Sequence, residues 1–266
     1  MNKIELVNDQ IKESILDDAI ELTVLEKNEL FDVNSVKIHV KKDTSLDFSL
    51  LCDEKSKLDV FIRVDPDVRF TLFELYQGKK MKVQYKYYLE ANACMNVFKF
   101  HDSYGFKEYD LVYLNGVGSS FDCYMKTISK LDEKYDFTIY HNSQNTVSNI
   151  HTGGVNIMDG TLKINVSGIV LNNKKNCVLN QYNRIINMTS NTCFIQPNLF
   201  IDEYEVEANH SAFIGKFHDD ELFYLQSRGI TEQLALNLLI KGFLLDGLYR
   251  EDKRMELVHL IDHYWR

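Results

Sequence analysis

The residues that could carry chemistry in this chain do not form a pattern typical of an enzyme. The sequence has no GxSxG nucleophile elbow, no HExxH zinc motif and no P-loop. Its carboxylate pairs, Asp202-Glu203 and Asp219-Asp220, are adjacent in sequence, so in a strand the two side chains would face opposite ways. The His151–Gly154 segment lacks the lysine of a phosphate-binding loop, and we interpret it as a turn. We therefore expect a protein that is not an enzyme by itself.

His210 is the candidate metal ligand. Val206, Ala208, His210 and Ala212 alternate with polar residues, which predicts a late strand that places the histidine among small apolar side chains. A neutral imidazole is a suitable ligand for iron. The alternative is an ordinary core or edge histidine. One ligand does not complete a metal site, so a second chain would have to supply thiolates.

The cysteines point to neither a zinc site nor a disulfide framework. They are odd in number and scattered, with no CxxC pair. We expect each to be a small buried hydrophobe. The five residues are Cys52, Cys94, Cys123, Cys177 and Cys193.

Composition excludes several classes of protein. The 266 residues are 45% hydrophobic and 26% charged, as in a globular protein. The net charge of −9, without a basic run, argues against nucleic acid as a partner. No apolar stretch approaches the ~20 residues that span a bilayer, and the acidic N-terminus does not resemble a signal peptide. We expect no membrane partner and a cytoplasmic location.

The hydrophobic period changes twice along the chain. Apolar residues at helical spacing predict one or two short helices over 3–27, in an N-terminal segment 1–30. Between 31 and 217, short β-branched and aromatic runs separated by polar turns predict a mainly β body without intervening helices. The asparagine-rich stretch after His141 suits a parallel β-helix, in which stacked asparagines bond along the axis, and equally suits an antiparallel sandwich.

Residues 218–266 predict a C-terminal helical domain. Asp219 is a suitable N-cap for the first helix, and Gly229 would end it in the left-handed conformation. Thr231 would cap a second helix that Gly247 ends, and a third helix is expected over 251–264.

The junction between the body and these helices resembles the SufB/SufD family of SUF iron–sulfur cluster assembly proteins. Three segments carry the resemblance, with fainter features upstream to His141. They are PNLFID (197–202), VEANHSAFIG (206–215) and DELFYLQSRGI (220–230), followed by Gly242-Phe243. Ser211 follows the histidine where SufB-like chains have glutamate, and Tyr182 stands where they have cysteine. Both departures favour SufD.

The resemblance implies a right-handed parallel β-helix core and a scaffold role. The last β-helix strands would pair with a SufB-type paralogue, and His210 would help to hold a transient iron–sulfur cluster at that interface. No cofactor would be bound permanently. SufD proteins often have a cysteine where this chain has Ala208, so ligation would depend on His210 alone. The C-terminal helices would dock the ABC-type ATPase SufC. The candidate docking residues are Leu222, Phe223, Tyr224, Arg228 and Phe243.

Two alternatives remain at this stage. The chain could pair with itself, as a homodimeric scaffold that binds SufC without SufB. It could instead be a β-solenoid carbohydrate-active enzyme, which would need carboxylates or basic residues converging on one face of the solenoid.

Overall fold

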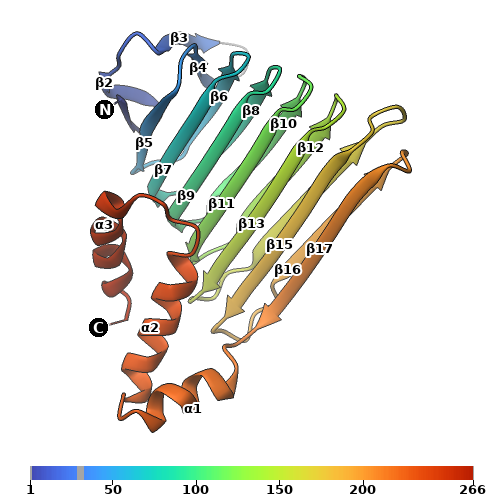
Figure 1. The fold of residues 1–266 in the computed structure, drawn as a ribbon. Coiled ribbons are helices and arrows are strands. Elements are labelled where there is room, and N and C mark those ends of the chain that lie inside the picture. Colours follow the sequence, from blue (N-terminus) through green and yellow to red (C-terminus); the bar gives the residue numbers. More distant parts are fainter. Residues whose placement is uncertain (1, 29–32, 266) are drawn as a thin grey trace.

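The computed structural model describes residues 2–28 and 33–265, and in these ranges seventeen strands precede three helices (Figure 1). The strands are β1 (Asn2–Val7), β2 (Gln10–Ile15), β3 (Ile20–Asn28), β4 (Val33–Val40), β5 (Thr44–Cys52), β6 (Ser56–Val64), β7 (Arg69–Lys79), β8 (Met81–Leu89), β9 (Cys94–Tyr104), β10 (Lys107–Leu114), β11 (Ser120–Ser129), β12 (Glu133–His141), β13 (Val147–Asn156), β14 (Leu162–Val170), β15 (Cys177–Asn187), β16 (Phe194–Ile201) and β17 (Val206–Gly215). The helices are α1 (Asp219–Ser227), α2 (Glu232–Leu244) and α3 (Glu251–Asp262).

The strands form two sheets that face each other. Sheet A has the order β17-β15-β13-β11-β9-β7-β5-β1-β2, and sheet B has the order β16-β14-β12-β10-β8-β6-β4-β3. From β4 onward the chain alternates between the sheets, and each strand pairs in parallel with the strand two places earlier or later. The result is a β-solenoid of about seven turns, so the expected β-helix is confirmed and the sandwich is excluded.

The helices predicted over residues 3–27 are wrong, and so is the turn predicted at His151–Gly154, which lies inside β13. Residues 3–27 form β1, β2 and β3, while residues 29–32 lie outside the described part of the chain. Ile4 and Leu6 point into the core and pair in register with Phe48 and Leu50 of β5. The period of two set by Ile4 and Leu6 determines the structure here, rather than the helical spacing. The reason is that β5 lies beside this segment, and burial against that strand outweighs the preference for a helix.

Asparagines stabilise the solenoid in the way the sequence suggested. On the outer face of sheet A, the Asn180 side-chain amide donates to Asn149 Oδ1 at 2.9 Å, and the Asn209 amide donates to Asn180 Oδ1 at 3.1 Å. Other asparagines occupy the corners, where the chain must adopt positive φ and asparagine is tolerated. These are Asn92, Asn145, Asn173 and Asn176.

The helices leave the last strand and return along the outer face of sheet A (Figure 1). Apolar residues of α2 and α3, including Ile240, Leu244, Leu257 and Ile261, pack on outward-facing side chains of the sheet such as Phe100. Polar contacts extend this attachment to β5, where Asp47 accepts from Arg250 at 3.0 Å and pairs with Lys253 at 2.8 Å. None of the described helices is long and apolar enough to cross a membrane.

The helix boundaries agree with the predicted capping residues at two of three positions. The Thr231 side chain accepts a hydrogen bond from the Leu234 backbone N–H, and Gly229 has φ +84°. The N-cap of α1, however, is His218 rather than Asp219. Its backbone N–H donates to the Glu221 carboxylate at 2.9 Å, which satisfies this donor from within the first turn.

The solenoid interior is not entirely apolar. Glu133 is buried between the sheets, where its carboxylate accepts from the hydroxyls of Ser103 at 2.7 Å and Tyr135 at 3.0 Å. Burial raises the pKa of Glu133 from 4.5 to about 7 despite these donors. The folded state therefore takes up a proton that the unfolded chain releases over this pH range.

Replacing Glu133 with glutamine should remove part of the pH dependence of stability. Because the folded-state pKa is raised, the stabilisation is present at low pH and is lost as pH rises through about 7. Between about pH 5 and about pH 8 the wild type should lose roughly 2 kcal/mol more than Glu133→Gln. Urea unfolding at both pH values measures the difference. An equal loss in both proteins would show that Glu133 does not titrate as described.

Candidate functional site

His210 lies on β17, the last strand of sheet A, in an unusual position. It is in register with Gln181 of β15, which is in register with Ile150 of β13. Gln181 and Ile150 are buried in the solenoid interior, so His210 continues an inward-facing column of side chains. The imidazole is nevertheless exposed, because β17 belongs to the last coil and no further coil covers it.

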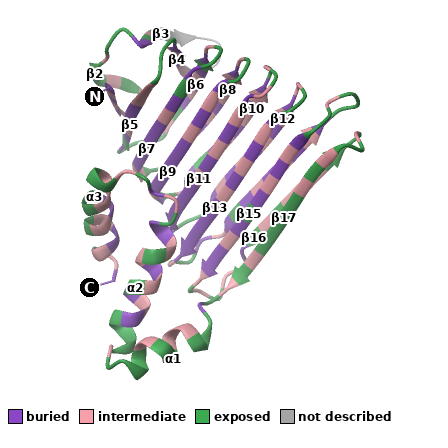
Figure 2. Ribbon diagram, in the orientation of Figure 1, coloured by how far each residue is buried: buried purple, intermediate pink, exposed green. Residues whose placement is uncertain are grey.

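The last coil leaves one end of the solenoid uncovered. We call β16 and β17 together the open end, since each pairs with a strand on one side only. Phe200 of β16 is 58% exposed and Ile214 of β17 is 43% exposed. Figure 2 shows exposed and intermediate residues along β17, whereas buried and intermediate residues alternate along the inner strands. An apolar strand edge of this kind is a surface on which another chain can pair.

No hydrogen bond or ion pair engages the His210 ring within residues 2–28 and 33–265. On the inward face of β17 its neighbours are Ala208 and Ala212, as the alternation predicted, and these small side chains leave the imidazole accessible. The ring is therefore available to a ligand approaching the open end.

Two cysteines lie close to the open end but are buried: Cys193 directly precedes β16, and Cys177 is the register partner of Val206 on β17. Four of the five cysteines are buried, and the fifth, Cys94, is half-buried on β9. The Cys177 thiol, on the neighbouring strand β15, contacts the Thr146 hydroxyl at 3.2 Å inside the solenoid. The expectation of buried cysteines is therefore confirmed for four of the five and is wrong for Cys94. The open end thus presents an imidazole and no exposed thiol of this chain.

Tyr182 and Ser211 are neighbours across two strands. They are direct register partners on β15 and β17, facing outward beside the His210 column. Tyr182 continues an aromatic stack with His151, at 4.7 Å between ring centroids, and Tyr124, at 4.3 Å from His151. Tyr182 and Ser211 therefore form one patch next to the histidine.

Four of the five predicted docking residues lie on or directly after α1. This helix has no buried residue, and Phe223 and Tyr224 are 71% and 58% exposed. Arg228 lies over the Tyr224 ring at 5.2 Å, and Leu222 is half-buried. We call these four residues the α1 surface.

The structure places Phe243 apart from the α1 surface. Its ring packs between α2 and sheet A, where Lys126 Nζ lies 5.0 Å from the ring centroid. A β-carbon at Gly153 of β13 would come within 2.9 Å of the Phe243 ring. Phe243 therefore attaches α2 to the solenoid. Leu234 and Leu238 of α2 are more exposed than Phe243, although neither was among the predicted docking residues.

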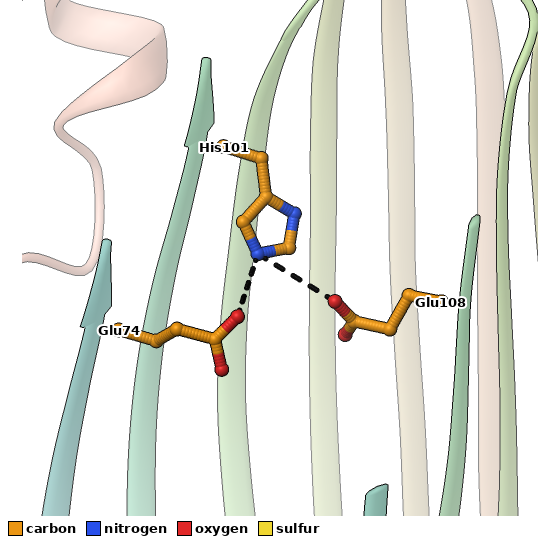
Figure 3. Close-up of side chains that lie close together, drawn as sticks. All are labelled: Glu74, His101 and Glu108. Atoms are coloured by element: carbon orange, nitrogen blue, oxygen red, sulfur yellow. Dashed lines mark hydrogen bonds and ion pairs between the residues drawn. The ribbon is translucent and has the colours of Figure 1, made fainter. Parts of the chain in front are cut away.

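A group of buried ionisable residues was not predicted from the sequence either. Glu74, His101 and Glu108 converge inside the solenoid, and all three are fully buried (Figure 3). The available signal was their position in the strand alternation. Glu74 shares the inward face of β7 with Phe70 and Leu72, where a charged residue is unexpected.

Comparisons with known proteins agree with this architecture. The model of the SUF system FeS cluster assembly, SufBD core domain, matches residues 15–243. An iron–sulfur cluster assembly SufBD family protein of Mycobacterium leprae is 41% identical over 71 residues, which cover 25% of this chain and 18% of that protein. The iron–sulfur cluster assembly protein SufD of Bacillus subtilis is 41% identical over 69 residues, which cover 25% of this chain and 16% of SufD.

A third relative, a SufBD family protein of Pyrococcus horikoshii, is 54% identical over 39 residues, covering 15% of this chain and 9% of that protein. These alignments span less than a fifth of each relative's length. The family model, in contrast, extends from β2 to α2 and includes both the open end and the α1 surface. The chain therefore belongs to the SufBD family of the SUF iron–sulfur cluster assembly system.

Proposed function

We propose that this chain is a SufD-like, non-enzymatic scaffold subunit that pairs through the open end and helps to hold a transient iron–sulfur cluster there. The observation that carries the proposal is the position of His210. It is an inward-facing residue that is exposed only because the solenoid ends at β17. A partner that continued the solenoid would enclose His210 in the new interface.

Strand pairing gives the physical basis for this interface. The outer edges of β16 and β17 retain backbone donors and acceptors that a second chain can use. Ile214 and Phe200 add apolar area next to these edges. Burying both side chains offsets the cost of association more effectively than polar contacts alone.

The positions of the thiols favour a SufB-type partner over self-pairing. An iron–sulfur cluster is held mainly by thiolates, with histidine as an occasional ligand. All five cysteines of this chain are buried or half-buried, so its open end contributes an imidazole and no exposed thiol. A partner with a cysteine at its own edge would complete the ligand set. The cluster is then the cargo of the assembly rather than a resident cofactor.

The α1 surface is the proposed dock for a SufC-type ATPase. An exposed aromatic pair on a short helix is costly to leave in water and suits an apolar groove on a partner. Leu234 and Leu238 extend the apolar area onto α2. Because α1 lies directly after β17, an ATPase that moved this helix would act close to the open end (Figure 1). Cytoplasmic action stays a prediction.

Replacing Ile214 with aspartate should weaken pairing at the open end. A buried charge at the interface should lower affinity for a SufB-type partner by roughly tenfold or more. Co-purification and sedimentation of the mixed chains measure this change. The matched control is Val24→Asp, an exposed β-branched residue on β3 at the opposite end of sheet B. Equal affinity for all three proteins would contradict pairing here, and a stable dimer of the isolated chain would favour self-pairing.

Replacing His210 with alanine should reduce cluster retention without dissociating the complex. Loss of a ligand contact should weaken retention roughly tenfold. Iron and sulfide analysis of the anaerobically reconstituted complex measures retention, and size-exclusion chromatography checks assembly. Asn209→Ala, the adjacent outward-facing residue on β17, is the control and should retain the cluster. Unchanged iron and sulfide in His210→Ala would rule out the ligand role.

Replacing Phe223 with aspartate should abolish most of the ATPase binding. Removing one buried aromatic anchor costs about 2 kcal/mol, which is roughly thirtyfold in affinity. Calorimetric titration with a SufC-type ATPase measures the affinity. Gln226→Asp introduces the same charge on α1 without removing an apolar group, and should bind like the wild type. If Phe223→Asp bound as tightly with its helices intact, the dock would lie elsewhere.

A further inference from the structure

Five ionisable side chains meet inside the solenoid, between sheets A and B. Sheet A supplies one residue from β7 and two from β9, and sheet B supplies two from β10. All five have fully buried side chains. We call them the interior cluster, which comprises Glu74, Lys99, His101, Glu108 and Asp110.

Lys99 neutralises only one side of the interior cluster. Its Nζ donates to Glu108 Oε1 at 2.6 Å and to Asp110 Oδ2 at 2.7 Å, and it lies 3.7 Å from the centroid of the Tyr85 ring. Glu74 Oε2 is farther from Lys99 Nζ, at 3.8 Å. Glu108 therefore directs one oxygen to Lys99 and leaves the other free to face His101.

His101 lies on the other side, between two carboxylates (Figure 3). Its Nε2 is 3.0 Å from Glu74 Oε1 and 3.5 Å from Glu108 Oε2. Glu74 Oε2, Glu108 Oε2 and Asp110 Oδ1 are buried and accept no hydrogen bond from the described residues, although the first two lie within ion-pair distance of Lys99 and His101. Buried carboxylate oxygens that accept no hydrogen bond are rare, since removing them from water is costly.

The charges of the interior cluster do not balance within the chain. Three carboxylates face one lysine and one histidine, so ionised carboxylates leave a net charge of −1 with a charged imidazole and −2 with a neutral one. A divalent cation beside a neutral His101 would bring the total to zero, because −3, +1 and +2 cancel.

The geometry also suits a cation. The three ligand atoms of Glu74, His101 and Glu108 all lie within 4.8 Å of one another. Metal–ligand bonds of about 2.1 Å place neighbouring ligand atoms about 3.0–3.4 Å apart, close to the two distances at His101 Nε2. One imidazole and two carboxylates form a donor set suited to Mn²⁺, Fe²⁺ or Zn²⁺.

We infer that Glu74, His101 and Glu108 form an internal binding site for one divalent transition-metal cation of this group, with Lys99 as a fixed positive charge beside it. The site is separate from His210, since β9 and β17 are four strand spacings apart, roughly 19 Å. The site does not need a partner chain, so its test is independent of the test of the proposed scaffold function.

Enclosure of the site determines how it must be tested. Because the interior cluster is fully buried, a cation should enter during folding and then leave slowly. The full chain would be unfolded in urea with chelator, refolded with equimolar Zn²⁺ or Mn²⁺, or anaerobically with Fe²⁺, and then desalted. Elemental analysis should find one tightly held ion per chain, and the midpoint of thermal unfolding should be higher than for chain refolded with chelator.

Ion retention by variants shows whether the cation binds at this site or at other side chains. His101→Gln and Glu74→Gln should each retain at least about tenfold less ion. Glu133→Gln removes a buried carboxylate from the same interior, and His210→Ala removes the exposed imidazole; both should retain the ion like the wild type. Circular dichroism establishes which variants fold. The ion content of His101→Gln or Glu74→Gln, whichever is folded, then shows whether the cluster binds the cation.

Three results would overturn the inference. The first is that the wild type retains none of the three ions after refolding. The second is that a folded His101→Gln or Glu74→Gln variant retains as much ion as the wild type. The third is that retention disappears in His210→Ala, which would assign the ion to the open end.

Discussion

Parallel pairing in register is the constraint on which the rest of this structure depends. Each strand places its inward side chains directly beside those of its neighbours in the same sheet, so the interior consists of continuous columns. One such column runs through Leu72, Val97, Cys123, Ile150 and Gln181 to His210. Every member is covered by the next coil except the last. The same rule that buries the core therefore exposes one histidine at the open end.

The returning helices cover one face of the solenoid and leave two neighbouring surfaces exposed. By packing α2 and α3 on sheet A and pairing with Asp47 near the other end of the solenoid, the tail covers the apolar outer face of the sheet. The open end and the α1 surface are the exposed regions that this arrangement leaves adjacent.

The interior cluster follows from the same columns. Glu74 and Lys99 are direct register partners, and His101 follows Lys99 by two residues on the same face of β9. Parallel register thus brings charges from separate coils within contact distance, where burial makes each unpaired oxygen costly. A bound cation would stabilise an arrangement that Lys99 and His101 compensate only in part.

Much of the fold could be predicted from the sequence because its signals are local. Strand runs from residue 36 onward, the asparagine corners and ladders, the cap at Thr231 and the left-handed Gly229 depend on neighbouring residues or on a short repeat. The inward orientation of His210 also followed from alternation with Ala208 and Ala212. The N-terminal segment could not be predicted in this way, because Ile4 and Leu6 become strand residues only when β5 lies beside them.

By itself, the sequence determined the chemical groups of this protein and the face on which most of them lie. The tertiary structure alone decided which of these groups meet and which are covered. It buried four of the five cysteines, packed Phe243 against the sheet, left Phe223 exposed to solvent, and brought Glu74 together with His101 and Glu108. The physical reason is that burial and charge contact depend on coils tens of residues apart, and only the register between those coils fixes their distances.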